Sequence, residues 1–183
     1  MKKSFGFAKT AVLRGVIILL SKVMGLVRDV MVAGTYGTTM YAVAYETASR
    51  LPVTIFDFVL GGVVTSAFIP VYNSIAVKEG RDKASAFTQS YLNLILLLTG
   101  IIAVCGVIFA PALVSFIAPD LSVEAAALSV RLTRIMFPMV IFVGLAFTFV
   151  GYLQSEGEYN IPAVISLVSN LIMVGYLAVS GMF

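Results

Sequence analysis

The sequence contains no histidine and a single cysteine, and only 11% of its 183 residues are charged. Without histidine, imidazole general bases and His-ligated metal sites are excluded. Cys105 cannot form a disulfide within the chain, and its place in the run IIAVCGVIFA indicates a small hydrophobic side chain that faces lipid or a neighbouring helix. The sequence shows no nucleophile–base constellation and no metal-ligand spacing, so we expect neither an enzyme nor a cofactor nor a bound metal.

Hydrophobic residues make up 60% of the chain, and its mean hydropathy is +1.04. Soluble domains are about 45–50% apolar and about 25% charged. The composition therefore predicts an integral membrane protein without a soluble domain. The net charge of +3 does not indicate a nucleic-acid partner, because the excess basic residues lie at the edges of apolar segments.

Five apolar segments are each long enough to cross a membrane, which takes about 20 residues. We expect all five to be helices, because only helices and closed barrels satisfy their backbone in lipid, and the alternation of barrel strands is absent. The expected helices cover residues 11–33, 40–77, 85–117, 123–154 and 160–182. The second contains Pro52, Gly61-Gly62 and Pro70, and we expect these to interrupt it.

Lysine and arginine in the short connections predict the orientation in the membrane. Basic residues concentrate at the N-terminus and in the turn after the second segment: Lys2, Lys3, Lys9, Arg14, Lys78, Arg81 and Lys83. The connections at residues 34–39 and 118–124 carry none. This bias places the N-terminus on the cytoplasmic side and, with five crossings, the C-terminus on the outer side.

The first apolar segment contains the stretch SKVMGLVRDV, whose polar residues gather on one side of a helix. At about 100° per residue, Ser21, Lys22, Gly25, Arg28 and Asp29 fall within about 120° of the helix circumference. A charged residue at mid-bilayer costs about 2.5–3.5 kcal/mol. The less costly arrangement directs this polar face toward a hydrated interior, where Gly25 lets a neighbouring backbone approach closely.

The second segment carries a similar polar face. Glu46 and Arg50 are spaced i,i+4 with the acid first, which is the favourable order for an ion pair. Asp57 falls within about 20° of Glu46 on an unbroken helix, although Pro52 lies between them. Two explanations stay open: these charges line a cavity, or they form ion pairs that only hold helices together. A third explanation, snorkelling to the membrane surface, applies chiefly to Lys22.

The stretches SKVMGLVRDVMVAGTYGTT, SRLP and TSAFIPVYNSI resemble the opening of the MurJ/MviN family of lipid II flippases. RLTRIMFPMVIFVGLAFTFVGYLQSEGEYNIPAVISLVSNLIMVG is similar to the family's fourth and fifth helices, so the resemblance covers nearly the whole chain. It implies a multi-pass transporter of the bacterial cytoplasmic membrane that moves undecaprenyl-linked peptidoglycan precursor from the inner to the outer leaflet by alternating access. It also implies two helical bundles in a V shape around a cationic cavity, which serve cell wall synthesis and cell shape.

The same resemblance supplies candidate roles for single residues. By motif, Ser21, Lys22, Arg28 and Asp29 fall on the family's cavity-lining first helix, and Arg50 falls on a basic position just before the L-P of the second. Arginine suits this role because its planar donor fork matches phosphate oxygens. The full set of predicted substrate-binding residues is Ser21, Lys22, Gly25, Arg28, Asp29, Glu46 and Arg50. The expected partners are a lipid-linked oligosaccharide and the membrane lipids.

The chain departs from the family pattern at two places. Phe56-Asp57 stands where the family commonly has an arginine pair, which replaces positive charge with negative charge. Val43 stands where the family has an acid early in the second helix, on a face that Glu46 can cover. The first departure indicates either a different lipid-linked substrate or a diphosphate clamp supplied from elsewhere.

The resemblance also bears on how much of a transporter this chain represents. Family members have two bundles of several helices each, so we expect an N-terminal portion of a longer protein, inactive without the remaining C-terminal helices. The alternatives to a lipid II flippase are a flippase for another lipid-linked oligosaccharide, such as a capsule, O-antigen or sporulation-related one, and a non-transporting membrane scaffold.

Overall fold

The computed structural model describes the backbone of residues 2–37, 39–62 and 64–180, and the side chains of residues 15–37, 39–62, 66–161 and 164–180. The described backbone is helical almost throughout and contains no strand, so the predicted all-α class is confirmed. The last two residues of the helix expected at 160–182 lie outside the described residues.

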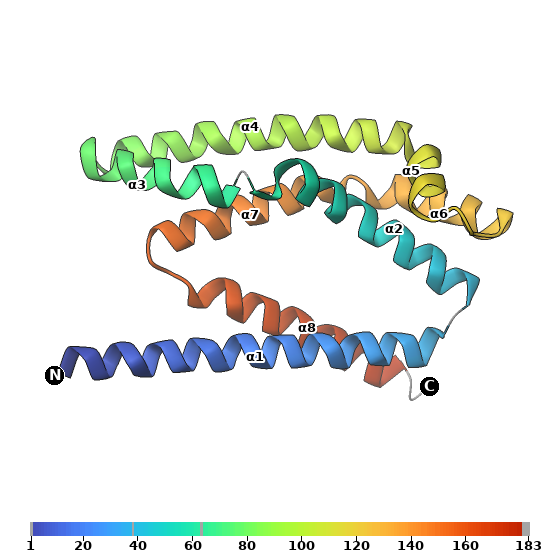
Figure 1. Cartoon of the computed structure of the whole chain (residues 1–183), viewed down its shortest axis with the longest axis horizontal. Coiled ribbons are helices and arrows are strands. Elements are labelled where there is room, and N and C mark those ends of the chain that lie inside the picture. The colour runs from blue at the N-terminus through green and yellow to red at the C-terminus, as the bar shows by residue number, and fades with distance from the viewer. Residues whose placement is uncertain (1, 38, 63, 181–183) are drawn as a thin grey trace. The chain divides into compact units, whose positions relative to one another are not determined.

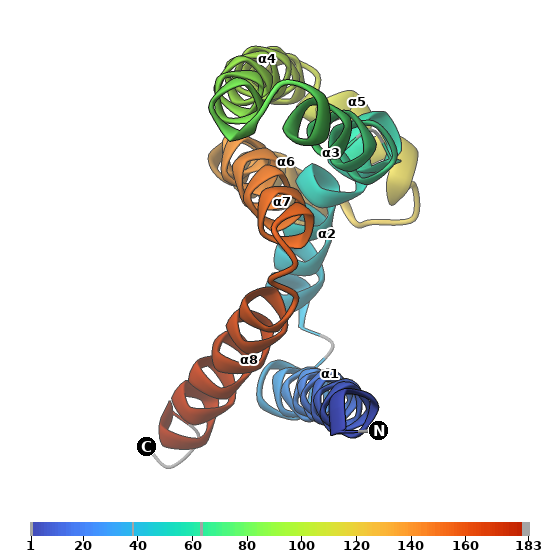
Figure 2. The same cartoon turned by 90° about the vertical axis from the view of Figure 1, so that its left-hand side faces the viewer.

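The chain forms two compact units. The first unit contains α1 (Lys2–Tyr36) and α8 (Asn160–Ser180), which are far apart in the sequence but cross in contact with each other (Figures 1 and 2). The second unit is the segment Thr39–Gly157. Its α-helices are α2 (Met40–Phe56), α3 (Ile69–Lys78), α4 (Arg81–Ile108), α5 (Ala110–Ile117), α6 (Val123–Met136) and α7 (Met139–Ser155).

Prolines account for three of the helix boundaries in the second unit. Pro70 and Pro111 lie in the first turns of α3 and α5, where a proline needs no hydrogen-bond partner for its missing N–H. The segment expected to be one helix over residues 85–117 is therefore two helices, α4 and α5. Pro138 is the N-cap of α7, and α6 and α7 meet there at a bend of 49°.

Pro52 behaves differently from these three. Helix α2 continues through Pro52 to Phe56, and the change in hydrogen bonding comes only afterwards, in the π-helical segments Asp57–Gly61 and Val64–Phe68. Pro52 and its neighbour Leu51 are buried, so packing holds the helix together where one backbone hydrogen bond is missing.

Length and apolar composition identify two helical stretches that can cross a membrane, Met40–Lys78 and Arg81–Ile108. The bent pair α6–α7 makes a third if it counts as one span. Within α8, Val164–Ser180 is a shorter apolar helix. The described residues thus support two or three spans by this measure, and membrane crossings by α1 and α8 stay predictions.

Aromatic rings and small residues fill the core of the second unit. Phe68, Tyr72 and Tyr91 pack together where α3 meets α4, with the Phe68 and Tyr91 ring centroids 4.8 Å apart. The end-on view in Figure 2 shows α3, α4 and α7 side by side around this region. At the adjoining ends of these helices, the Glu156 carboxylate accepts a hydrogen bond of 2.5 Å from the Tyr72 hydroxyl and lies 3.5 Å from Nη2 of Arg81.

Candidate functional site

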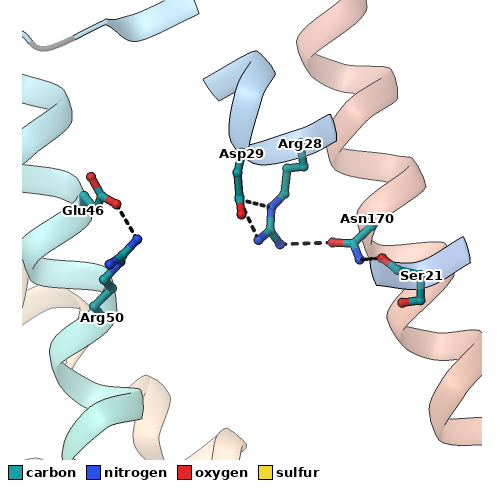
Figure 3. A network of polar contacts seen from close by, with 6 residues as sticks. All are labelled: Ser21, Arg28, Asp29, Glu46, Arg50 and Asn170. Carbon is teal, nitrogen blue, oxygen red and sulfur yellow. Dashed lines mark hydrogen bonds and ion pairs between the residues drawn. The ribbon is translucent and has the colours of Figure 1, made fainter. Parts of the chain in front are cut away.

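The polar face of α1 contacts α8 through Ser21. Its side chain is almost fully buried, and its hydroxyl donates a hydrogen bond of 2.8 Å to Oγ of Ser166. One turn further along α8, the Asn170 amide nitrogen donates a bond of 3.1 Å to the Ser21 carbonyl oxygen (Figure 3). Both partners of Ser21 therefore come from α8, and the contact joins two helices that are distant in sequence.

Arg28 lies at the other end of this polar seam, which we define as Ser21, Arg28, Asp29, Ser166 and Asn170. Its Nε and Nη2 atoms donate to Oδ1 of Asp29 at 3.0 and 2.9 Å, and its Nη1 atom donates to Oδ1 of Asn170 at 3.0 Å (Figure 3). A guanidinium has five N–H donors, so these three bonds leave two donors for another acceptor. The Arg28 side chain is 39% exposed, so a ligand can reach them.

The predicted polar arc of α1 therefore divides into two parts. Ser21, Gly25 and Arg28 are partly or fully covered, and all three face α8, whereas Lys22 and Asp29 are exposed. Among the described side chains, Lys22 forms no hydrogen bond or ion pair. A methyl group built on Gly25 would lie 3.6 Å from the Asn170 amide nitrogen, which is ordinary contact, so the approach of α8 does not require glycine there.

The polar face of α2 is organised within its own helix. Nη2 of Arg50 lies 2.6 Å from Oε1 of Glu46, in the i,i+4 pair that the sequence indicates (Figure 3). Both side chains are more than half exposed. Asp57 is also exposed, whereas its neighbour Phe56 is fully buried in the core of the second unit. Of the two residues that stand in place of the family's arginine pair, only Asp57 is therefore exposed.

Sequence reasoning missed two participants in the seam, Ser166 and Asn170. They are spaced i,i+4 in a largely apolar stretch of α8, which places them on one helix face. Asn170 is 8% exposed and uses both ends of its amide, so it links Ser21 to Arg28. A polar pair at helical spacing in an apolar segment was the available signal, because such residues are costly unless they bond across helices.

In the part of the chain that the structure describes, no group of three or more Cys, Asp or Glu side chains is close enough to hold a metal ion. Each unit separately carries charged side chains on an apolar helix: Lys22, Arg28 and Asp29 on α1 of the first unit, and Glu46 and Arg50 on α2 of the second. Side chains of this kind interact through hydrogen bonds and charge.

Comparison with known proteins identifies the family. The profile described as "Lipid II flippase MurJ" matches residues 32–182. The chain belongs to the MurJ lipid II flippase family. The predicted resemblance is thereby confirmed, and the profile match begins just after the residues of α1 that form the seam.

Individual MurJ relatives match over most of the chain. The lipid II flippase MurJ of Burkholderia cenocepacia is 27% identical over 158 residues, which are 85% of this chain and 31% of the relative. The probable lipid II flippase MurJ of Synechocystis sp. is 29% identical over 182 residues, which are 98% and 33%. The probable lipid II flippase MurJ of Treponema pallidum is 30% identical over 161 residues, which are 85% and 30%.

The chain spans about a third of the length of the curated relatives that it matches. MurJ is a family of transporters rather than of enzymes in the usual sense. Family membership and the apolar helices together indicate a multi-pass protein of the bacterial inner membrane.

Proposed function

We propose that the complete gene product moves a lipid-linked peptidoglycan precursor, lipid II, from the inner to the outer leaflet by alternating access. The observation that carries this proposal is the MurJ match over residues 32–182. The chain contributes part of an N-terminal transmembrane bundle, and transport requires the rest of the gene product. The basic residues before and after the first two segments favour a cytoplasmic N-terminus.

In this proposal the α1 face binds the anionic part of the substrate. Arg28 is held from two sides by Asp29 and Asn170, so its two remaining donors have a fixed direction. A preorganised guanidinium suits a diphosphate because two parallel N–H groups match two phosphate oxygens. Asp29 neutralises Arg28, but the exposed ammonium of Lys22 six residues away leaves the α1 face with a net positive charge. Ser21 and Gly25 shape the covered side of this face.

The α2 face has a second role in the proposal. Glu46 and Arg50 neutralise each other, so they offer hydrogen-bond donors and acceptors without net charge. Such a pair suits the hydroxyl and amide groups of a sugar headgroup rather than its phosphates. In this proposal the predicted residues on α1 bind phosphate or, as Asp29 does, hold the arginine that binds it, and Glu46 and Arg50 on α2 bind the headgroup.

Depletion and complementation in the source bacterium test this function. Depletion of the gene product should cause lipid-linked peptidoglycan precursor to accumulate and cells to lyse, and the wild-type gene should restore growth. Arg28→Ala should insert normally but reduce transport at least about tenfold, because it removes the fixed phosphate donors. Arg134→Ala, which removes an exposed arginine at the end of α6, is the matched control and should complement.

Complementation by Arg28→Ala would contradict the role of the α1 face. A second candidate function, transport of another lipid-linked oligosaccharide, is favoured by one observation, the exposed acid Asp57 in place of the family's arginine pair. Loss of capsule or another surface glycan on depletion, with normal peptidoglycan precursor levels, would support that second function.

A further inference from the structure

Asp57 is a charged side chain in an apolar stretch, and its position is unusual in three respects. It lies near the middle of the 39-residue candidate span Met40–Lys78. It is exposed, and it begins a π-helical segment, a local geometry that is frequent at functional sites. A carboxylate at this depth is costly unless it faces water or a partner, so an intramembrane acid is a candidate functional residue.

The neighbours of Asp57 leave its charge uncompensated. Within the described side chains, no lysine or arginine forms an ion pair with it. The arginine nearest to it along α2, Arg50, is engaged by Glu46 at 2.6 Å. The face that runs from Glu46 and Arg50 on α2 to Asp57, the first residue of the π-helical segment that follows, therefore has two acids and one base. Its net negative charge lies at Asp57.

The local geometry directs the carboxylate along the helix. Oδ1 of Asp57 lies 3.1 Å from the place where a methyl group on Gly61 would be, so the carboxylate leans over a residue without a side chain. Thr54, one turn before Asp57, is exposed as well and adds a hydroxyl near the same face. The result is an open acceptor site with one full negative charge.

The chemistry of such a site favours an organic cation over a metal ion. Hard metal cations take about six or more oxygen ligands, and no cluster of three acidic or thiol side chains surrounds Asp57 in the described part of the chain. A primary ammonium has only three donors and is satisfied by one carboxylate and one or two neutral oxygens. Asp57 and Thr54 meet that smaller requirement.

We infer that Asp57 is a specificity-determining residue that binds a primary ammonium group on the headgroup of the transported lipid. This inference rests on the proposed function, and it deepens that function by assigning Asp57 to a cationic part of the substrate. Asp57 then adds recognition of a positively charged group to the phosphate recognition that the proposed function assigns to other residues of the protein.

The test measures initial transport rates by the complete gene product in liposomes, with two substrates. One is a lipid-linked precursor that carries a free primary amine, and the other is the same precursor with that amine acetylated. Wild-type protein should transport the amine form about fivefold faster, which corresponds to about 1 kcal/mol. Asp57→Asn should remove this preference, and Asp57→Glu should retain most of it.

Two further variants test whether the preference depends on negative charge alone or on the position of the Asp57 carboxylate. Glu79→Gln removes one negative charge just beyond the end of α3, outside the span core, and should leave the preference unchanged. Gly61→Ala keeps the charge but displaces the carboxylate, so it should weaken the preference about twofold or more.

The outcomes distinguish this inference from the function on which it rests. Equal rates for the two substrates with wild-type protein would overturn the inference and leave the proposed function standing. A preference that persists in Asp57→Asn would also overturn it. Transport of neither substrate would overturn the proposed function itself and, with it, the ammonium site.

Discussion

Helices α1 and α8 meet through hydrogen bonds that cross from one helix to the other, whereas α4 and α7 meet through close packing. In the α1–α8 contact, Asn170 and Ser166 bond to groups on α1. In the α4–α7 contact, the buried hydroxyls of Thr99 and Thr148 donate to carbonyls of their own helices, at 2.6 and 2.9 Å. Similar polar residues therefore play different parts in the two contacts.

The difference shows which polar residues can carry function. A hydroxyl that bonds to the backbone of its own helix is satisfied wherever that helix lies, so it specifies no partner. A side chain that bonds across helices fixes how two elements meet and also orients its partner, as Asn170 does for Arg28. We therefore place the candidate phosphate-binding residues in the α1–α8 contact and regard the α4–α7 contact as structural.

Among the variants that test this comparison, we expect the largest loss of stability from Gly144→Ala in α7. A methyl group there would lie 2.7 Å from Cγ2 of Thr99 and 2.9 Å from Cγ2 of Ile95, so the helices must separate. Overpacking of this kind costs about 1–3 kcal/mol. Thermal unfolding in detergent measures the loss. Gly25→Ala in the α1–α8 contact is the matched variant, and equal destabilisation by both would remove the distinction between the contacts.

We expect an intermediate loss of stability from Asn170→Ala. Hydrogen bonds between membrane helices contribute about 0.6–1.7 kcal/mol, and this change removes one bond to Ser21 and one to Arg28. Transport should fall as well, because Arg28 loses one of its two supports. Thr148→Val, which removes a bond within one helix, should change stability less and transport not at all. A larger loss of transport from Thr148→Val would reverse our assignment of the two contacts.

The smallest effect is expected from the exposed pair on α2. Arg50 and Glu46 form an i,i+4 ion pair, and such pairs contribute about 0.3–0.5 kcal/mol. Glu46→Gln should therefore barely change the unfolding temperature, and the small difference should disappear at high salt. A salt-insensitive loss of more than about 1 kcal/mol would mean that this pair is structural, like the α4–α7 packing.

The local sequence pattern was sufficient to predict several features of this protein. The absence of alternation predicted helices, and the gathering of polar residues at helical spacing identified Arg28 and the Glu46–Arg50 pair. Helix boundaries were harder to predict: Pro52 lies within α2, whereas Pro111 and Pro138 lie where α5 and α7 begin. A proline lacks its N–H in each case, but only inside a helix does this remove a hydrogen bond, and around Pro52 buried packing holds the helix together.

The sequence by itself determined that the chain is helical and apolar, because periodicity and composition are properties of neighbouring residues. Its motifs resembled those of the MurJ family, and the profile match confirmed that resemblance. Only the tertiary structure decided which polar side chains meet across two helices. Arg28 and Asn170 are 142 residues apart in the chain, and no spacing rule links them. The physical reason is that helix periodicity fixes the direction of a side chain from its own axis, whereas the helix packed against that face depends on the fold of the whole chain.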